Sequence, residues 1–128
     1  MDVQVCPALT DAALNALLAH GSPITAPRGF GPILARSLVY CAIFRDGMLI
    51  GFVNVAWDGG IHAFLLDPTV HPDYRRQGLG LALVRTAVAE STARGAEWMH
   101  VDFESRLSPF YKAAGFRATE AGVIRLAG

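Results

Sequence analysis

The stretch Val-His-Pro-Asp-Tyr-Arg-Arg-Gln-Gly-Leu-Gly, residues 70–80, is followed at once by an apolar run with helical spacing. It places Arg75 and Arg76 beside Gly78 and Gly80 at the start of that helix. The start of a helix carries unpaired backbone N–H groups and the positive end of the helix dipole, and both attract anions. Glycine lets a bulky group approach the backbone, and arginine adds planar charged donors. The stretch therefore predicts a site for a phosphorylated ligand.

Two common phosphate-binding motifs do not match this stretch. The Walker motif requires Lys-Ser or Lys-Thr after its last glycine, whereas Leu81 and Ala82 follow Gly80. The dinucleotide fingerprint requires three glycines in the first strand–helix unit, and this stretch has two glycines in the second half of the chain. The pattern that does match is Arg or Gln, two residues, Gly, one residue, and Gly or Ala, which residues 75–80 satisfy.

Through this pattern, residues 38–126 resemble the GNAT family of N-acetyltransferases, which holds the diphosphate of coenzyme A in such a loop. A second signature of the family, Phe-Tyr-Lys-Ala-Ala-Gly-Phe, follows in the expected order at residues 110–116. The resemblance implies acetyl-CoA as cosubstrate. The residues it implies for cofactor binding are Thr69, Val70, Arg75, Arg76, Gln77, Gly78, Leu79, Gly80 and Leu81.

Hydrophobic periodicity predicts an α/β fold in one domain over residues 1–128. We expect a helix capped by Thr10 or Asp11, an antiparallel meander of three strands, and a strand–helix–strand unit whose strands are parallel. The sheet is thus mixed, mostly antiparallel, and flanked by helices. The expected ranges are helices over 11–19, 78–93 and 107–114, a helical turn over 34–37, strands over 38–44, 48–57, 61–70 and 97–103, and a hairpin over 116–120 and 123–126.

Pro68 lies inside the third strand of the meander, where it has no N–H to donate to a neighbouring strand. Such a proline indicates a bulge or a strand edge. In the GNAT resemblance, the same strand bulges just before the phosphate loop and separates from its neighbour. The pantetheine arm of the cofactor then pairs with the exposed backbone, here at residues 67–70.

The resemblance also assigns roles in acetyl transfer. Tyr111 occupies the position of the general acid that protonates the departing thiolate, and the backbone N–H of Val70 that of the oxyanion donor. Many family members carry a glutamate base on the strand before the loop, but residues 61–70 offer His62 and Asp67 instead. Both stay open as candidates for the base.

Further titratable residues follow on the next strand. His100 and Asp102 fall on one face of that strand, where they can meet the acceptor. Glu104 stands at the spacing where family members often carry a cofactor-binding asparagine. A carboxylate suits a diphosphate poorly, so Glu104 favours a cationic acceptor such as an amine.

Composition limits the function classes. With 52% hydrophobic and 17% charged residues and a formal net charge of +0, the chain is globular and has no general attraction to nucleic acid or anionic lipid. No run approaches the ~18 apolar residues that span a bilayer. The N-terminus shows no secretory signal, and Cys6 and Cys41 are expected to be reduced thiols. We therefore expect a cytoplasmic protein without nucleic-acid or membrane partners, and the scattered histidines predict no metal site.

The preferred hypothesis is an N-acetyltransferase in which a primary amine attacks acetyl-CoA directly. The alternative is a non-catalytic acyl-CoA-binding module of the same fold, and a toxin that modifies nucleic acid is disfavoured by the zero net charge. The glycine- and proline-rich segment over residues 20–37, which the resemblance places at the acceptor site, does not reveal the acceptor. Because many family members dimerise, pairing into a homodimer through a sheet edge or the C-terminal hairpin stays open.

Overall fold

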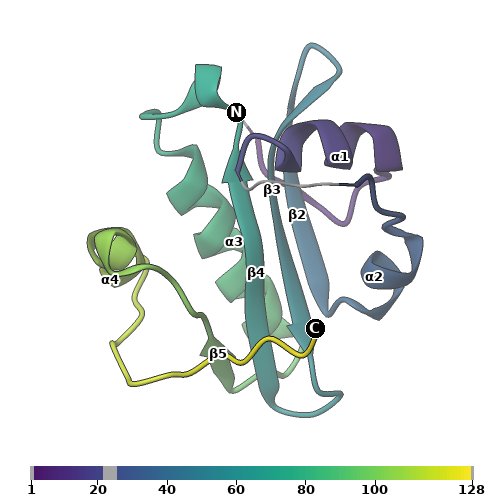
Figure 1. The fold of residues 1–128 in the computed structure, drawn as a ribbon. Helices are drawn as coiled ribbons and strands as arrows, with labels where there is room; N and C mark the ends of the chain where they lie inside the picture. The colour runs from purple at the N-terminus through teal and green to yellow at the C-terminus, as the bar shows by residue number, and fades with distance from the viewer. Residues whose placement is uncertain (1, 22–25, 128) are drawn as a thin grey trace.

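The computed structural model describes residues 2–21 and 26–127. A five-stranded mixed sheet in the order β1-β2-β3-β4-β5 forms the centre of the domain (Figure 1). The elements are β1 (Gln4–Val5), α1 (Asp11–Leu18), α2 (Gly31–Arg36), β2 (Val39–Arg45), β3 (Met48–Trp57), β4 (His62–Val70), the 3-10 turn η1 (Pro72–Tyr74), α3 (Leu79–Ala93), β5 (Trp98–His100), η2 (Ser105–Leu107) and α4 (Ser108–Ala113).

The strand pairing confirms the predicted topology. β2, β3 and β4 form an antiparallel meander, whereas β4 and β5 are parallel and joined through α3. The predicted range of β3 is met at both ends, and the Thr10 side chain caps α1 by accepting from the N–H of Ala13. These elements form where the hydrophobic period and the local capping residue agree.

Helices cover both faces of the sheet. α3 packs on one face, where its Leu83 and Val84 join a buried cluster with Val53 and Val55 of β3. α1 and α2 lie on the opposite face, where Phe52 packs against α1. The side chains of β3 thus alternate between the two cores, as a strand buried on both faces requires.

β4 contains the predicted bulge. Phe52 pairs with Thr69 and Asn54 with Leu66, so β4 has one more residue than β3 across this interval. Asp67 takes up the extra length in the left-handed region, with φ of 55°. β5 pairs with β4 only over residues 62–64, and in the described part of the chain no strand accompanies β4 on that side from residue 65 onward. The two strands therefore separate where the resemblance implies.

Two expectations need correction, and one element was not expected. β5 ends at residue 100 rather than 103, and the short strand β1 was not predicted. The C-terminal hairpin over 116–120 and 123–126 is wrong, because the described residues from 116 to 127 contain no strand. Tight hairpin turns need positive φ, and neither Ala121 nor Gly122 adopts it. This tail (yellow in Figure 1) instead passes in front of β4 and β5, on the side of the sheet opposite α3.

Candidate active site

The predicted phosphate loop, residues 71–78, connects β4 to α3. η1 begins the loop, and the His71 side chain caps it by accepting from the N–H of Asp73 at 3.1 Å. Arg76 and Gly78 both adopt left-handed backbone conformations, with φ of 63° and 77°, and Gly78 is the N-cap of α3. The loop therefore turns sharply at the helix start, so that the first N–H groups of α3 stay free for a ligand.

A cavity of about 310 Å³ lies at the start of α3. The predicted cofactor residues that line it are Val70, Arg75, Arg76, Gly78, Leu79, Gly80 and Leu81. Thr69 and Gln77, which were predicted with them, are not part of its wall. The structure therefore brings together most of the predicted set.

Two further residues of this wall were missed by the sequence reasoning, Tyr74 and Phe110. Phe110 belongs to the second signature, 30 positions after Gly80, and a Cβ built on Gly80 would lie 3.4 Å from its ring. Gly80 thus lets α3 approach α4 closely. Reading the two signatures as neighbours in space could have identified Phe110.

The open side of β4 presents backbone groups next to this cavity. The N–H of His71 donates to the carbonyl of Ile50 on β3 at 2.7 Å. Because successive N–H groups along a strand point to opposite sides, the N–H of Val70 is directed away from β3, to the side that β5 has left. Its carbonyl accepts from Nε of Arg75 at 3.2 Å, which holds the guanidinium beside this edge.

Tyr111 lies at the centre of an aromatic group on α4. Its ring stacks on Phe103 at 4.5 Å between centroids and contacts Phe110 edge-on at 5.0 Å. The residue is 4% exposed, and its hydroxyl forms no hydrogen bond with any residue that the structure describes. Burial, and next the negative charge of Asp102, raise the pKa of Tyr111 above its usual value. The hydroxyl therefore stays protonated at neutral pH and is free to donate.

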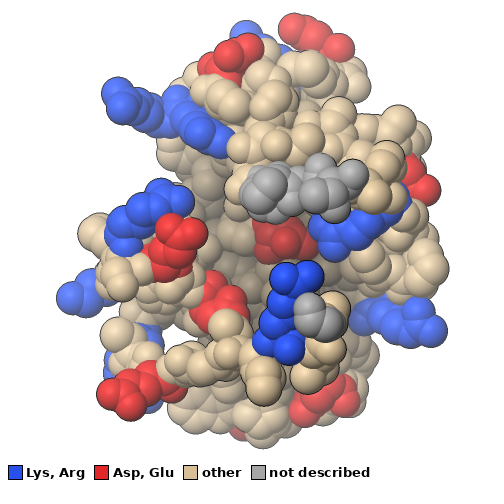
Figure 2. Space-filling view, viewed as in Figure 1, with Lys and Arg blue, Asp and Glu red and all other residues tan. Residues whose placement is uncertain are grey.

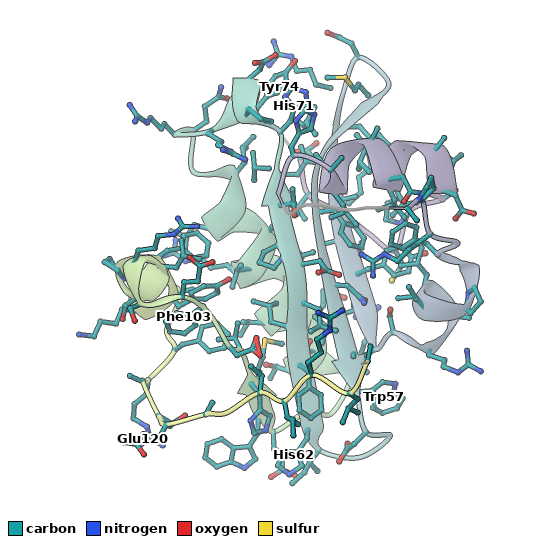
Figure 3. All side chains as sticks on the ribbon, in the orientation of Figure 1. Trp57, His62, His71, Tyr74, Phe103 and Glu120 are labelled. Carbon is teal, nitrogen blue, oxygen red and sulfur yellow. The ribbon has the colours of Figure 1, made fainter. Side chains whose placement is uncertain are left out.

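The two candidate bases lie at different ends of β4. Asp67 is exposed and sits at the bulge, where β4 and β5 have separated. His62 begins the strand and hydrogen-bonds to His100 of β5, with Nδ1 and Nε2 2.9 Å apart. Figure 3 shows His62 at the opposite end of the sheet from His71 and Tyr74 of the phosphate loop. Asp67 lies five positions after His62, which is about 16 Å along an extended strand.

The surface in front of β4 is hollowed. Figure 2 shows this hollow between the side of the molecule that carries α4 and the side that carries α1 and α2, with acidic groups on its surface. Glu104 accepts from Nε of Arg106 at 2.9 Å, so its charge is locally balanced. The predicted acceptor segment over residues 20–37 reaches this region through Gly21, whose Cβ would meet the Thr69 side chain at 3.2 Å. Its residues 22–25 lie outside the described part of the chain.

The described residues contain neither a metal-binding cluster nor a membrane-spanning helix. Over residues 2–21 and 26–127, no three or more His, Cys, Asp or Glu side chains gather in a way that could hold a metal ion. Within the same ranges, no helix combines the length and the apolar character needed to cross a membrane.

Comparison with known proteins places these features in a family. Residues 36–118 match the family model described as acetyltransferase (GNAT) domain. The chain is 38% identical over 77 residues to a mycothiol acetyltransferase of Mycolicibacterium vanbaalenii, which covers 60% of this chain and 25% of that protein. The chain thus spans about a quarter of the length of this curated relative.

Solved structures show the same fold. A Trypanosoma brucei acetyltransferase superposes with a TM-score of 0.78 at 25% identity, covering 98% of this chain and 99% of that one. An aminoglycoside N-acetyltransferase in complex with CoA superposes with a TM-score of 0.74 at 18% identity, covering 98% of this chain and 93% of that one.

Proposed function

The chain belongs to the acetyltransferase (GNAT) family, and from this premise we propose that it transfers an acetyl group from acetyl-CoA to a primary amine. One observation carries the proposal. The cavity at the start of α3 adjoins the unpaired side of β4, so an anion-binding loop and free strand backbone form one continuous site. A diphosphate linked to an amide-containing arm suits such a site, because the loop accepts the charge and the strand accepts the amides.

The proposed position of the cofactor follows from this geometry. The diphosphate would lie against residues 75–81, where free helix N–H groups and two guanidinium groups converge. The pantetheine arm would run along the open side of β4 toward the bulge. Gln77 and Thr69 stay predicted contacts, although neither lines the cavity.

Acetyl-CoA and the amine would reach the site of reaction from opposite faces of the sheet. Val70 and Tyr111 pack with the core on the α3 face, whereas Thr69 pairs with Phe52 on the face that α1 covers. The separation of β4 from β5 connects the two faces. Acetyl-CoA and the amine can therefore bind at the same time, which direct transfer requires.

In the proposed reaction, the amine nitrogen forms a bond to the thioester carbonyl carbon, and the bond from that carbon to sulfur breaks. The N–H of Val70 stabilises the negative charge that develops on the carbonyl oxygen. The Tyr111 hydroxyl donates a proton to the departing thiolate. Asp67 receives the ammonium proton, directly or through water, and its place at the bulge supports it over His62. No covalent enzyme intermediate is needed.

Exchanging Tyr111 for phenylalanine tests this function. We expect Tyr111→Phe to lower kcat by roughly 10²–10⁴-fold, the usual contribution of a general acid. The affinity for acetyl-CoA should be unchanged, because the ring keeps its stacking on Phe103. Free thiol released from acetyl-CoA with a panel of primary amines measures turnover, and calorimetric titration measures binding. Tyr40→Phe, on β2, is the matched control.

Two outcomes would contradict parts of this proposal. Equal thiol release by Tyr111→Phe and the unmodified protein would remove Tyr111 as the acid. Binding of acetyl-CoA without thiol release from any amine would favour the non-catalytic acyl-CoA-binding module, which the missing strand glutamate supports. A homodimer and a cytoplasmic location stay predictions.

A further inference from the structure

An exposed apolar surface on β4 and β5 has no part in the proposed cofactor site. Phe64 and Leu66 of β4 and Trp98 of β5 are 39%, 40% and 56% exposed. Together with His100 they form what we call the apolar strip. Leu66 pairs with Asn54, and His62 and Phe64 pair with Trp98 and His100, so the strip lies on one face of the sheet, opposite α3.

Two rings of the strip, Phe64 and His100, are held in place before any ligand binds. His100 stacks on Phe64, with 5.1 Å between centroids and an interplanar angle of 20°. His100 is fixed in turn by its hydrogen bond to His62. Phe64 and Leu66 remain exposed although the C-terminal tail passes over this side of the sheet (Figure 1). A preorganised apolar surface of this kind binds a ligand at low entropic cost.

Two carboxylates stand at the end of the strip nearest the bulge. Asp67 directly follows Leu66. Phe64 comes two residues before Leu66, which places it about 7 Å from Leu66 along β4, on the side away from the bulge. Asp102 lies beyond the end of β5; its neighbours Val101 and Phe103 pack against the core on the α3 face, whereas Asp102 is exposed, as His100 is. Neither carboxylate forms a salt bridge with a described residue, whereas Glu104 is paired with Arg106.

A separate observation points to a ligand here. Tyr111 is 4% exposed, and its hydroxyl forms no hydrogen bond within residues 2–21 and 26–127 but is not among the fully buried unpartnered atoms there, so a ligand can reach it. Burial, and next the charge of Asp102, raises the pKa of Tyr111. Asp67 and Asp102 both follow the last paired residues of β4 and β5, Phe64 and His100, and so come where the two strands separate.

We propose that the acceptor is a primary amine that carries an aromatic or branched apolar group. Its ammonium group would bind between Asp67 and Asp102, and its apolar group would cover Phe64 and Leu66. The complementary charge and the apolar area both fit such a ligand, whereas an aminosugar or a polyamine would leave the strip uncovered. This inference rests on the proposed function and specifies its substrate class.

The first test compares an aromatic primary amine with amines that lack an apolar ring. At saturating acetyl-CoA, phenethylamine should give a kcat/KM at least about tenfold above propylamine, spermidine and glucosamine, because a ring buried on the strip gains roughly 25 cal/mol per Å². Phe64→Ala and Leu66→Ala should each reduce this preference several-fold. Trp57→Ala is the matched control, because Trp57 is equally exposed but pairs with Ala63 on the α3 face, and it should leave the preference unchanged.

The second test concerns the carboxylate. Asp102→Asn should raise KM for phenethylamine at least about tenfold, since it removes a charge partner of the ammonium, and leave the affinity for acetyl-CoA unchanged. Asp102→Glu should restore part of the loss, which a purely structural role would not predict.

The outcomes separate this inference from the proposed function. If propylamine, spermidine or glucosamine is acetylated as well as phenethylamine, or if Trp57→Ala matches Phe64→Ala, the inference is overturned and the acetyltransferase function stands. If no amine is acetylated, the function fails, and binding of phenethylamine to the CoA complex is measured directly by calorimetry. Binding that Phe64→Ala abolishes would support the strip, and absence of binding would overturn it.

Discussion

Replacing Gly78 with alanine separates backbone strain from side-chain contact at the phosphate loop. Gly78 has φ of 77°, and a Cβ built on it meets nothing within 4 Å. The substitution therefore causes no clash, and its cost is that of holding an L-residue in the left-handed region, roughly 1–2 kcal/mol. For a chain of 128 residues, this lowers Tm by about 4–7 °C.

The matched control is Gly31→Ala. Gly31 also has nothing within 4 Å of its Cβ, but its φ is not positive. Alanine at this position restricts the unfolded chain and causes no strain in the folded one. We therefore expect the free energy of unfolding to stay the same or to rise by up to about 1 kcal/mol. Thermal and urea unfolding of both variants, with the same m-value, measure the difference. Equal stability of Gly78→Ala and Gly31→Ala would refute the strain argument.

Gly78→Asn extends the test to ligand binding. Asparagine tolerates the left-handed region better than alanine, so it should cost less stability. Its side chain starts from the wall of the cavity, where the diphosphate is proposed to lie. We therefore expect Gly78→Asn to weaken acetyl-CoA binding more than Gly78→Ala while unfolding at a higher temperature. The reverse order in calorimetric titration would place the diphosphate elsewhere.

Three further predictions concern the core. Ser91→Ala should stabilise the protein by about 1 kcal/mol in urea unfolding, because the buried Ser91 hydroxyl lacks a partner among the described residues; a loss would mean that the hydroxyl is bonded. Burial, then the charge of Cys6, raises the pKa of Cys41 to about 12. The contribution of the neutral Cys41 thiol to the free energy of unfolding is full below pH 9 and falls as pH rises toward 12, by up to about 1.4 kcal/mol per pH unit. Urea unfolding at pH 8–11 should therefore show a smaller fall in stability for Cys41→Val than for the unmodified protein. Gly51→Ala puts a Cβ 3.0 Å from Leu83 and should cost about 1–3 kcal/mol, which Leu83→Val should partly restore if contact is the cause.

Elements with a strong local signal could be predicted from the sequence. Thr10 supplies a cap, residues 48–57 form a mostly apolar strand after a turn signal, and the run after Gly78 has helical period. Pro68 marked the bulge because a missing N–H is a property of the residue itself. Each of these depends on residues close together in the chain.

Features that depend on distant partners could not be predicted. The hairpin over 116–126 needs a turn with positive φ that its residues do not adopt. The pairing of β1 with β2 joins segments more than thirty residues apart, and two residues of strand leave almost no local pattern. The contact of His62 with His100 likewise exists because β4 and β5 are neighbours.

The candidate site divides in the same way. The sequence by itself predicted an anion site at residues 75–80, because these residues lie consecutively and a helix start carries free N–H groups. Only the tertiary structure shows that Phe110 lines the cavity, that the N–H of Val70 is directed to an open strand edge, and that Asp67 and Asp102 follow one end of an apolar strip. These depend on the register of β4 against β3 and on where β5 ends, which is set by packing of the whole sheet.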